Sequence, residues 1–291
     1  MRKMFVRVVL VVLVLAVFAG CREEEKGTVS ITYVNWEEGV AWTNLFATIL
    51  EDEMDYEVEL TQAEVGPAYT SVAAGDQDFF MEAWLPNLHA NYVEGEDYVE
   101  VSMIYENAVL GLIVPEYMAE DGVTQLSDLA RPEVVEKLNG QIIGIDPSAG
   151  MMIKTEEELI PKYGLDEAGI ELVPSSDTRM MAALKSAIEN EEYIVGMGWQ
   201  PHSMFGRFDL VILEQDGPRI WEKNNVYILG RPGVDEDFPK VVEFFDNAIF
   251  TNDTIGPLMV HIADSELDTL EAAREWKNEN MEVWVDWIPE E

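Results

Sequence analysis

The stretch GDQDFFMEAWLPNLH (residues 75–89) places an apolar strand directly before a Trp-x-Pro sequence that begins at Trp84. A short apolar run of this length is typical of a buried strand. Because proline cannot continue a strand, the strand is expected to end beside the tryptophan. The same order recurs in VGMGWQPHSMF (195–205), where Trp199 is followed two residues later by proline and then by histidine. Two strands are therefore expected to end at a tryptophan.

Strand-like and helix-like segments alternate around these two stretches. The β-branched content of TVSITYVNW (28–36) predicts a strand, and apolar residues in 37–53 recur with the period of a helix. Strands are expected at 28–36, 56–64, 79–84, 140–147, 170–174 and 193–199, and helices at 37–53, 66–76, 154–164 and 178–192. Strands separated by helices predict parallel α/β sheets with right-handed crossovers. Because this rhythm occurs twice, two similar α/β lobes are expected.

Two β-rich stretches, NAVLGLIVPEY (107–117) and NNVYILGRPG (224–233), separate the two sets and are interpreted as paired crossing strands. The chain would leave the first lobe, build the second and return. Amphipathic helices at 239–250 and 265–288 would complete the first lobe. The predicted boundaries are 28–110 together with 225–291 for lobe 1, and 111–224 for lobe 2.

The N-terminus has the pattern of an export signal. Three basic residues flank an 11-residue apolar run at 8–18, which is too short to span a bilayer. The run ends in FAGC, which resembles the lipobox of bacterial lipoproteins, so Cys21 is expected to be acylated. The predictions are a signal peptide at 1–20, a polar tether at 21–27, and an extracytoplasmic protein held at the cell membrane by a lipid anchor. Because Cys21 is the only cysteine, an internal disulfide is excluded.

The charge balance argues against nucleic acid as a partner. The chain has 18 Lys and Arg against 57 Asp and Glu, a net charge of −39 that repels the phosphates of nucleic acids. The acidic residues are spread along the whole chain, as on an ordinary solvated surface. Adaptation to high salt is an alternative, since dissolved ions would screen this repulsion.

Chemistry of an enzyme is not indicated by the sequence. The three histidines, His89, His202 and His261, lack metal-ligand spacing, and no nucleophile elbow, phosphate-binding loop or dinucleotide-binding turn occurs. No catalytic residue, cofactor or metal site is predicted.

The positions of the tryptophans suggest a ligand site instead. In open α/β sheets, ligands bind beyond the carboxyl ends of the strands, where Trp36, Trp84 and Trp199 are expected. These three side chains are therefore predicted to lie on the rim of a cleft. Four other tryptophans fit the faces of helices and are assigned to packing: Trp42, Trp276, Trp284 and Trp287.

Four segments together resemble the substrate-binding proteins of ABC importers for glycine betaine and proline betaine. They are YVNWEEGVAWTNLFATILE (33–51), GDQDFFMEAWLPNLH (75–89), GIDPSAGMM (144–152) and GWQPHSMFGRFDLVIL (198–213). The resemblance covers nearly the whole chain after the signal peptide. It implies a two-lobe, type II periplasmic-binding-protein-like α/β fold, with the ligand cleft between the lobes and an ABC permease as partner.

The resemblance also implies the site. A quaternary ammonium group would lie among Trp36, Trp84 and Trp199. Its carboxylate would meet the backbone N–H groups of Gly150 and Met151 and the side chain of His89, more strongly if that histidine were protonated. Glycine betaine or proline betaine is the expected ligand, for osmoprotection. Choline as the ligand, and a lipid-tethered sensor domain in place of a transport protein, are alternatives.

Elementary chemistry agrees with such a site. A trimethylammonium group has no N–H to donate, so aromatic faces attract it through cation–π interactions, and Trp provides the best face. A helix beginning near Gly150 would point unpaired N–H groups at a carboxylate. The hypothesis for the mechanism is closure of the two lobes about strands near 108–114 and 225–231, with ligand contacts stabilising the closed state.

Overall fold

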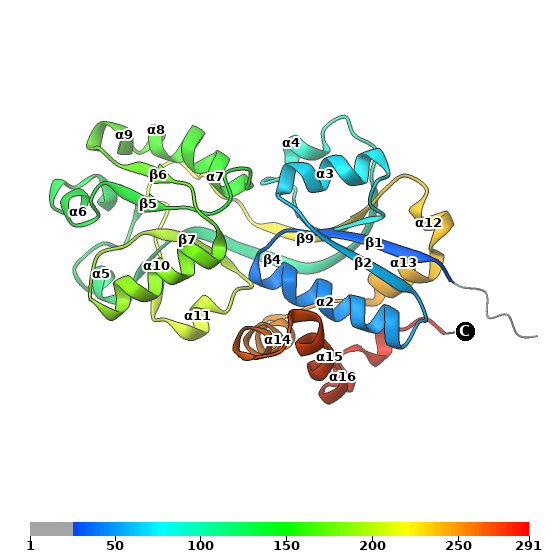
Figure 1. Ribbon diagram of the computed structural model, residues 1–291. Helices are drawn as coiled ribbons and strands as arrows, with labels where there is room; N and C mark the ends of the chain where they lie inside the picture. The colour runs from blue at the N-terminus through cyan, green and yellow to red at the C-terminus, as the bar shows by residue number, and fades with distance from the viewer. Residues whose placement is uncertain (1–25, 291) are drawn as a thin grey trace, which may run out of the picture.

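The computed structural model describes residues 26–290. The predicted signal peptide, the lipidation at Cys21 and most of the tether lie outside these residues. Figure 1 shows two α/β lobes side by side, with strands β4 and β9 running across the middle of the molecule from one to the other. The predicted α/β class and two-lobe architecture are confirmed.

The sheet of the first lobe is mostly parallel, and β9 alone runs in the opposite direction to its neighbours. Its order is β2-β1-β3-β9-β4, in which β1 pairs in parallel with β2 and β3, and β9 is antiparallel to both β3 and β4. The strands are β1 (Thr28–Tyr33), β2 (Glu57–Gln62), β3 (Phe79–Leu85), β4 (Val99–Pro115) and β9 (Asn224–Gly230). Every residue of β3 except the last is buried, as its continuous apolar run predicts.

The sheet of the second lobe begins with the far end of β4. There β4 pairs antiparallel with β7 and β8, and the parallel strands β5 and β6 extend the sheet beyond β7. The strands are β5 (Gln141–Ile143), β6 (Glu171–Val173), β7 (Gly196–Gln200) and β8 (Leu210–Ile212). The predicted pairing of two crossing strands is confirmed, but β4 begins at Val99 and not at residue 107. Its first part pairs with β9 and its last part with β7 and β8, so one strand serves both sheets.

Helices cover both sheets (Figure 1). In the first lobe they are α2 (Glu37–Asp52), α3 (Val65–Ala74), α4 (Ala90–Val93), α12 (Val234–Asp237), α13 (Pro239–Asn247), α14 (Asn252–Asp264), α15 (Thr269–Glu279), α16 (Met281–Trp284) and η3 (Val285–Trp287). In the second lobe they are α5 (Glu116–Glu120), η1 (Leu126–Ala130), α6 (Pro132–Lys137), α7 (Gly150–Lys154), η2 (Thr155–Leu159), α8 (Ile160–Lys162), α9 (Leu165–Ala168), α10 (Asp177–Glu189) and α11 (Met204–Arg207). In residues 26–290, no helix is both long enough and apolar enough to cross a bilayer.

The C-terminal region differs from its prediction. The single helix expected at 265–288 is wrong, because the chain leaves helical geometry at Asn280 and forms α15, α16 and η3 in succession. After this break, Trp284 Nε1 donates to the carbonyl of Lys277 at 2.9 Å. The break also buries both Trp284 and Trp287. Helix α14 was not predicted, since Pro257 lies inside it.

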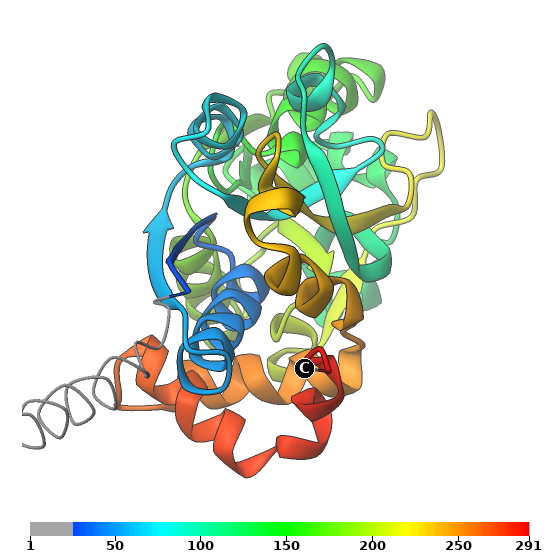
Figure 2. The same cartoon turned by 90° about the vertical axis from the view of Figure 1, so that its right-hand side faces the viewer.

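Helix α2 forms the centre of the first lobe's core. The ring of Phe46 lies 5.1 to 6.0 Å from four other aromatic rings, those of Phe244, Phe245, Phe250 and Trp287. Figure 2 shows the C-terminal helices (orange to red) packed beneath α2 (blue). The N-terminal end of α2 points toward the second lobe, so this packing holds the start of the helix in place at the boundary between the lobes (Figure 1).

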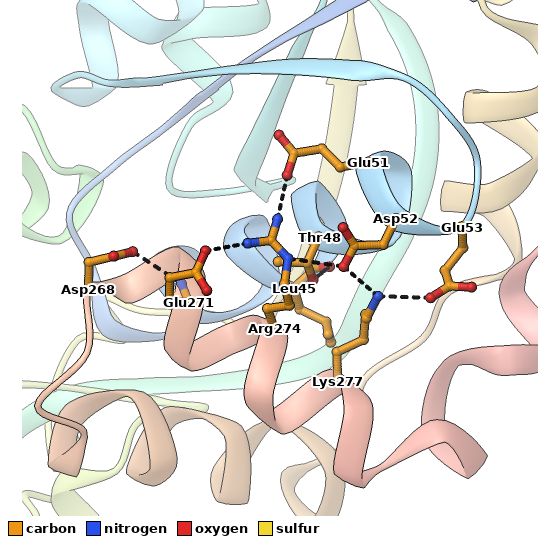
Figure 3. A network of polar contacts seen from close by, with 9 residues as sticks. All are labelled: Leu45, Thr48, Glu51, Asp52, Glu53, Asp268, Glu271, Arg274 and Lys277. Carbon is orange, nitrogen blue, oxygen red and sulfur yellow. Dashed lines mark hydrogen bonds and ion pairs between the residues drawn. The ribbon is translucent and has the colours of Figure 1, made fainter.

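The other end of α2 is joined to α15 by a network of charged groups (Figure 3). Arg274 donates to Glu51 at 2.6 Å and to Asp52 at 3.0 Å. Lys277 is 1% exposed and donates to Asp52 at 2.7 Å and to Glu53 at 2.8 Å. Every acid at this end of the helix thus has a cation within hydrogen-bond distance.

Candidate functional site: an aromatic pocket between the lobes

A small pocket of about 260 Å³ lies where the two lobes meet. Its lining contains all six residues predicted as ligand contacts: Trp36, Trp84, His89, Gly150, Met151 and Trp199. The first three come from the first lobe and the last three from the second, so the pocket is made by both lobes together.

Three indoles line the pocket together. The ring centroid of Trp36 lies 6.4 Å from that of Trp84 and 6.4 Å from that of Trp199, with interplanar angles of 81° and 57°. The indole nitrogens of Trp36 and Trp84 are buried and have no partner in the described residues. The three rings, called here the cage, thus present faces in different planes around one volume.

The backbone places two of these rings as the sequence predicts and one differently. Trp84 and Trp199 are the next-to-last residues of β3 and β7. The prediction that Trp36 ends a strand is wrong, because β1 stops at Tyr33 and Trp36 is the N-cap of α2. The start of a helix, not the end of a strand, therefore holds the third ring.

His89 lies beside the cage, 6.2 Å from the Trp36 ring centroid, and its tautomer follows from its hydrogen bonds. The backbone N–H of Trp84 points at His89 Nδ1, 3.2 Å away, and a backbone N–H can only donate. Nδ1 is therefore the acceptor, so the proton of the neutral ring is on Nε2. That Nε2 is buried without a partner in the described residues, and the side chain lines the pocket.

Burial keeps this ring neutral. His89 is fully buried, and desolvation lowers its pKa to about 3. The stronger donor that protonation would give is therefore not available near neutral pH, because removing the imidazolium from water costs too much here. Neutral His89 still offers one N–H, held in direction by Trp84 and by the hydroxyl of Tyr69, 3.1 Å from Nδ1.

Gly150 and Met151 open helix α7 and line the same pocket as the cage. The N-cap residue is Ala149, which has no side-chain oxygen to accept from the first-turn N–H groups. A Cβ at Gly150 would lie 2.4 Å from the carbonyl oxygen of Leu88. The lack of a side chain at Gly150 thus lets the backbone of the first lobe approach closely.

Acidic side chains lie directly behind the cage. Trp199 Nε1 donates to Glu38 Oε2 at 2.9 Å, which links β7 of the second lobe to α2 of the first. Glu82 accepts from the backbone N–H of Val34. Its carboxyl group also packs against Gly39, where a Cβ would overlap with it. Desolvation by burial raises the pKa of Glu38 to about 8, and it raises the pKa of Glu82 well above its usual value.

A histidine and two further acids complete this layer. The His202 ring lies 4.6 Å from the Trp199 ring, with Nδ1 3.0 Å from Glu37 and Nε2 3.1 Å from Asp177. Burial lowers the pKa of His202, but the charges of Asp177 and then Glu37 outweigh this and raise it overall. His202 is thus buried, and its partners come from both lobes.

A scan against protein families matches residues 27–279 to OpuAC, the substrate-binding domain of ABC-type glycine betaine transport systems. The chain belongs to this family. The resemblance inferred from the four sequence segments is thereby confirmed, and the fold is that of a solute-binding domain of a transport system.

This OpuAC domain is similar to several proteins that bind betaines or choline, by their sequences or by their structures. It is 32% identical over 180 residues to the glycine betaine/carnitine transport binding protein GbuC of Listeria monocytogenes, a match that covers 62% of this chain and 59% of that protein. Among solved structures, the glycine betaine/L-proline-binding protein ProX of Borrelia burgdorferi is 31% identical with a TM-score of 0.83, covering 90% of this chain and 97% of that one. An ABC-transporter choline-binding protein in complex with choline is 28% identical with a TM-score of 0.80, covering 92% and 93%.

Sequence reasoning missed part of this domain's pocket. Four further residues line it: Leu88, Leu110, Ile145 and Ala149. Of these, Leu110 belongs to the crossing strand β4, and an isolated leucine in an apolar strand carries no signal of a site. Glu38 was also missed, although an acid two residues after Trp36 at the start of a buried helix was a signal that could have been followed.

Proposed function

We propose that this OpuAC-family domain captures glycine betaine, or a related quaternary-ammonium zwitterion, in the pocket between its lobes and delivers it to an ABC permease for osmoprotection. The observation that carries the proposal is the pairing, in one pocket, of three indole faces with a neutral histidine N–H that has no partner in the described residues. The indole faces suit a cation that cannot donate hydrogen bonds, and the histidine N–H suits an acceptor.

The cage would bind the ammonium end. Each indole face in contact with the cation contributes about 0.5 to 2 kcal/mol, so Trp36, Trp84 and Trp199 together contribute about 2 to 6 kcal/mol. A micromolar affinity requires about 8 kcal/mol. The remainder has to come from the other end of the ligand.

The carboxylate end would meet His89 Nε2 and the backbone N–H groups of Gly150 and Met151. A hydrogen bond to a charged group contributes about 1.5 to 3 kcal/mol, and the start of a helix favours an anion. Choline is the second candidate, because the fold resembles the choline complex nearly as well as the betaine-binding protein. Choline has no carboxylate, however, and would leave these donors unused, so a betaine is preferred.

The mechanism we propose is closure of the lobes on the ligand. Lobe 1 would comprise 28–110 and 225–291 and lobe 2 would comprise 111–224, with β4 and β9 as the hinge. Since the cage takes Trp36 and Trp84 from one lobe and Trp199 from the other, the ligand contacts are complete only when the lobes are together, and binding favours the closed form.

We further propose that the domain works outside the cytoplasm, anchored through a lipid on Cys21. The apolar run at 8–18 and the FAGC sequence support this assignment. Replacing Cys21 by Ala is expected to release the protein from membranes into the soluble fraction and to abolish incorporation of a labelled fatty acid. Continued labelling of the variant would contradict the anchor.

Calorimetric titration of the chain without residues 1–20 tests the function. The expected result is micromolar affinity for glycine betaine or proline betaine, and at least about tenfold weaker binding of choline, which cannot use the donors. Binding of a sugar or an ordinary amino acid, with no heat from any quaternary amine, would overturn the proposal.

A variant at His89 separates the two ends of the ligand. His89→Ala is expected to weaken betaine binding about 10- to 100-fold while leaving choline binding much less affected. His261→Ala, which removes a histidine outside the pocket, serves as the control and is expected to bind like the unmodified protein. Equal losses for betaine and choline in His89→Ala would argue against a contact between this ring and the carboxylate.

A further inference from the structure

The side chain of Glu38 stands behind the cage without touching the pocket. It is fully buried, and its Oε2 accepts the indole N–H of Trp199 at 2.9 Å. Its other oxygen, Oε1, is buried and has no hydrogen-bond partner in the described residues. In residues 26–290 no Lys or Arg lies within ion-pair distance of Glu38, in contrast to the acids at the far end of the same helix.

We propose that Glu38 is a positioning residue of the cage, which fixes Trp199 across the boundary between the lobes and supplies, through that indole, the negative charge that balances the bound cation. This inference rests on the proposed function, because it assigns Glu38 a role toward a quaternary ammonium group in the same pocket.

The positioning part follows from the hydrogen bond. Trp199 belongs to β7 and Glu38 to α2, so the bond joins the lobes and sets the plane of the third cage wall. The face of the ring binds a cation only when it is turned toward it. Without the bond, the ring could rotate and its N–H would be left unpaired.

The charge part follows from the direction of the bond. A carboxylate that accepts the indole N–H pushes electron density into the ring, since hydrogen-bonded groups polarise one another in a low dielectric. A cation on the face of that ring is then attracted both by the ring and by the carboxylate behind it. A neutral carboxyl or amide provides the same hydrogen bond with a much weaker attraction.

The groups around Glu38 determine when it is ionised. On its own helix lies Glu37; from β3 comes Glu82, from α10 Asp177, from the turn after β7 His202, and from β4 Tyr105. Burial dominates and raises the pKa of Glu38 to about 8, and Asp177 raises it further, whereas His202 and the Trp199 hydrogen bond oppose the rise. Near neutral pH the ligand-free protein thus holds a proton on Glu38.

Binding and ionisation of Glu38 are therefore linked. A cation in the cage favours the carboxylate, so it lowers the pKa of Glu38 and releases its proton. Affinity is then expected to rise with pH up to about 8 and to level off above it. Each unit by which the ligand lowers this pKa corresponds to about a tenfold difference in affinity between the two protonation states.

Calorimetry measures the released proton directly. Glycine betaine is titrated into the unmodified protein at pH 7.5 in buffers of different ionisation enthalpy. The expected slope of heat against buffer enthalpy corresponds to release of a fraction of one proton, and the affinity is expected to rise about tenfold from pH 6 to pH 8.5. Binding without proton release and with a flat pH profile would overturn the charge role, whatever any variant does.

Two variants at Glu38 separate position from charge. Glu38→Gln keeps an acceptor for the indole N–H but cannot ionise, so it is expected to abolish proton release and to lose about tenfold in affinity at pH 8.5 while changing little at pH 6. Glu38→Ala also removes the acceptor and is expected to weaken binding at both pH values. If Glu38→Gln binds betaine like the unmodified protein at pH 6 but not at pH 8.5, the charge is needed as well as the hydrogen bond. A merely structural role would not give this dependence on pH.

Two controls identify the source of the proton. Glu51→Gln changes an acid at the opposite end of α2 and is expected to retain both the affinity and the proton release of the unmodified protein. Glu82→Gln changes a second fully buried carboxyl near the cage and is expected to retain proton release. Loss of proton release in Glu82→Gln but not in Glu38→Gln would overturn the assignment.

The failure of this inference can be told apart from the failure of the proposed function. If the unmodified protein binds no betaine at all, the proposed function fails. If the unmodified protein binds betaine and Glu38→Gln binds it with the same affinity at every pH, only this inference fails.

Discussion

The acidic side chains at the two ends of helix α2 have different partners. At the C-terminal end, Glu51, Asp52 and the following Glu53 meet the cations of Arg274 and Lys277 (Figure 3). At the N-terminal end, buried Glu38 meets an indole N–H, and its charged neighbours are other acids and His202. At one end each acid has a Lys or Arg within hydrogen-bond distance, and at the other Glu38 has neither among the described residues.

The helix dipole explains part of this difference. Acids in the last turn of a helix face the negative end of the dipole, so a compensating cation is needed there, whereas acids in the first turn are stabilised by the positive end. The dipole does not remove the cost of burying Glu38, however. The positioning role proposed for Glu38 accounts for a carboxyl in such a place, since for stability alone an apolar side chain would serve better.

The largest expected effect comes from removing the cation at the paired end. Lys277→Met leaves Asp52 and Glu53 facing each other without the buried ammonium group, and is expected to lower the free energy of unfolding by about 3 kcal/mol. Denaturant unfolding measures this loss. Ligand affinity is expected to stay unchanged; a change in affinity with unchanged stability would break the contrast between the two ends.

The next effect is at the cage. Trp199→Ala removes one indole face together with the bond to Glu38, and is expected to weaken betaine binding about 10- to 100-fold. Trp276→Phe, a change to a tryptophan outside the pocket, is the control for loss of intrinsic fluorescence in the titration. Full affinity in Trp199→Ala would remove this ring from the site.

A smaller effect concerns stability without ligand. The folded-state pKa of Glu38 is raised from 4.5 to about 8, so its contribution to stability is present below about pH 4.5 and is lost as the pH rises toward 8. Glu38→Gln cannot ionise, and at pH 8 it is expected to be more stable than the unmodified protein by about 1 to 2 kcal/mol. Thermal melting at pH 5 and pH 8 measures this; a variant that is less stable at pH 8 would show that the carboxylate is needed for folding.

The smallest effect has the opposite sign of pH dependence. Lys277 and Arg274 lower the pKa of Asp52 despite partial burial, so its contribution is present above about pH 4 and is lost as the pH falls. Because the side chain is 31% exposed, Asp52→Asn is expected to cost less than about 1 kcal/mol at pH 7 and nothing at pH 3. Acid unfolding curves compare the two proteins, and an equal cost at both pH values would contradict the ion-pair explanation.

Much of this molecule could be predicted from the sequence because its signals are local. Alternating strand and helix periodicity predicted the two lobes, and Trp-x-Pro after a short apolar run located Trp84 and Trp199. The position of His89 followed from the resemblance, and the structure brings it to the same pocket as the indoles.

What could not be predicted depends on contacts between distant segments. The neutral state of His89 follows from complete burial and from a hydrogen bond that fixes its tautomer, and neither is visible in a sequence. The meeting of Glu38 with Trp199 joins residues 161 positions apart. The break at Asn280 occurs because packing of Trp284 and Trp287 overrides a helical pattern that continues through it.

Strand β9 pairs with β3 although more than a hundred residues separate them, and all of the second lobe's sheet lies between. During synthesis from the N-terminus, β3 therefore emerges long before β9. Until β9 is made, the edge of β3 that pairs with it has no hydrogen-bond partners. Such late pairing of distant segments is slow and leaves the nascent chain prone to aggregation. A ribosome-bound chain that stops before residue 224 is accordingly expected to need a chaperone, whereas one that extends past β9 can complete this sheet unaided.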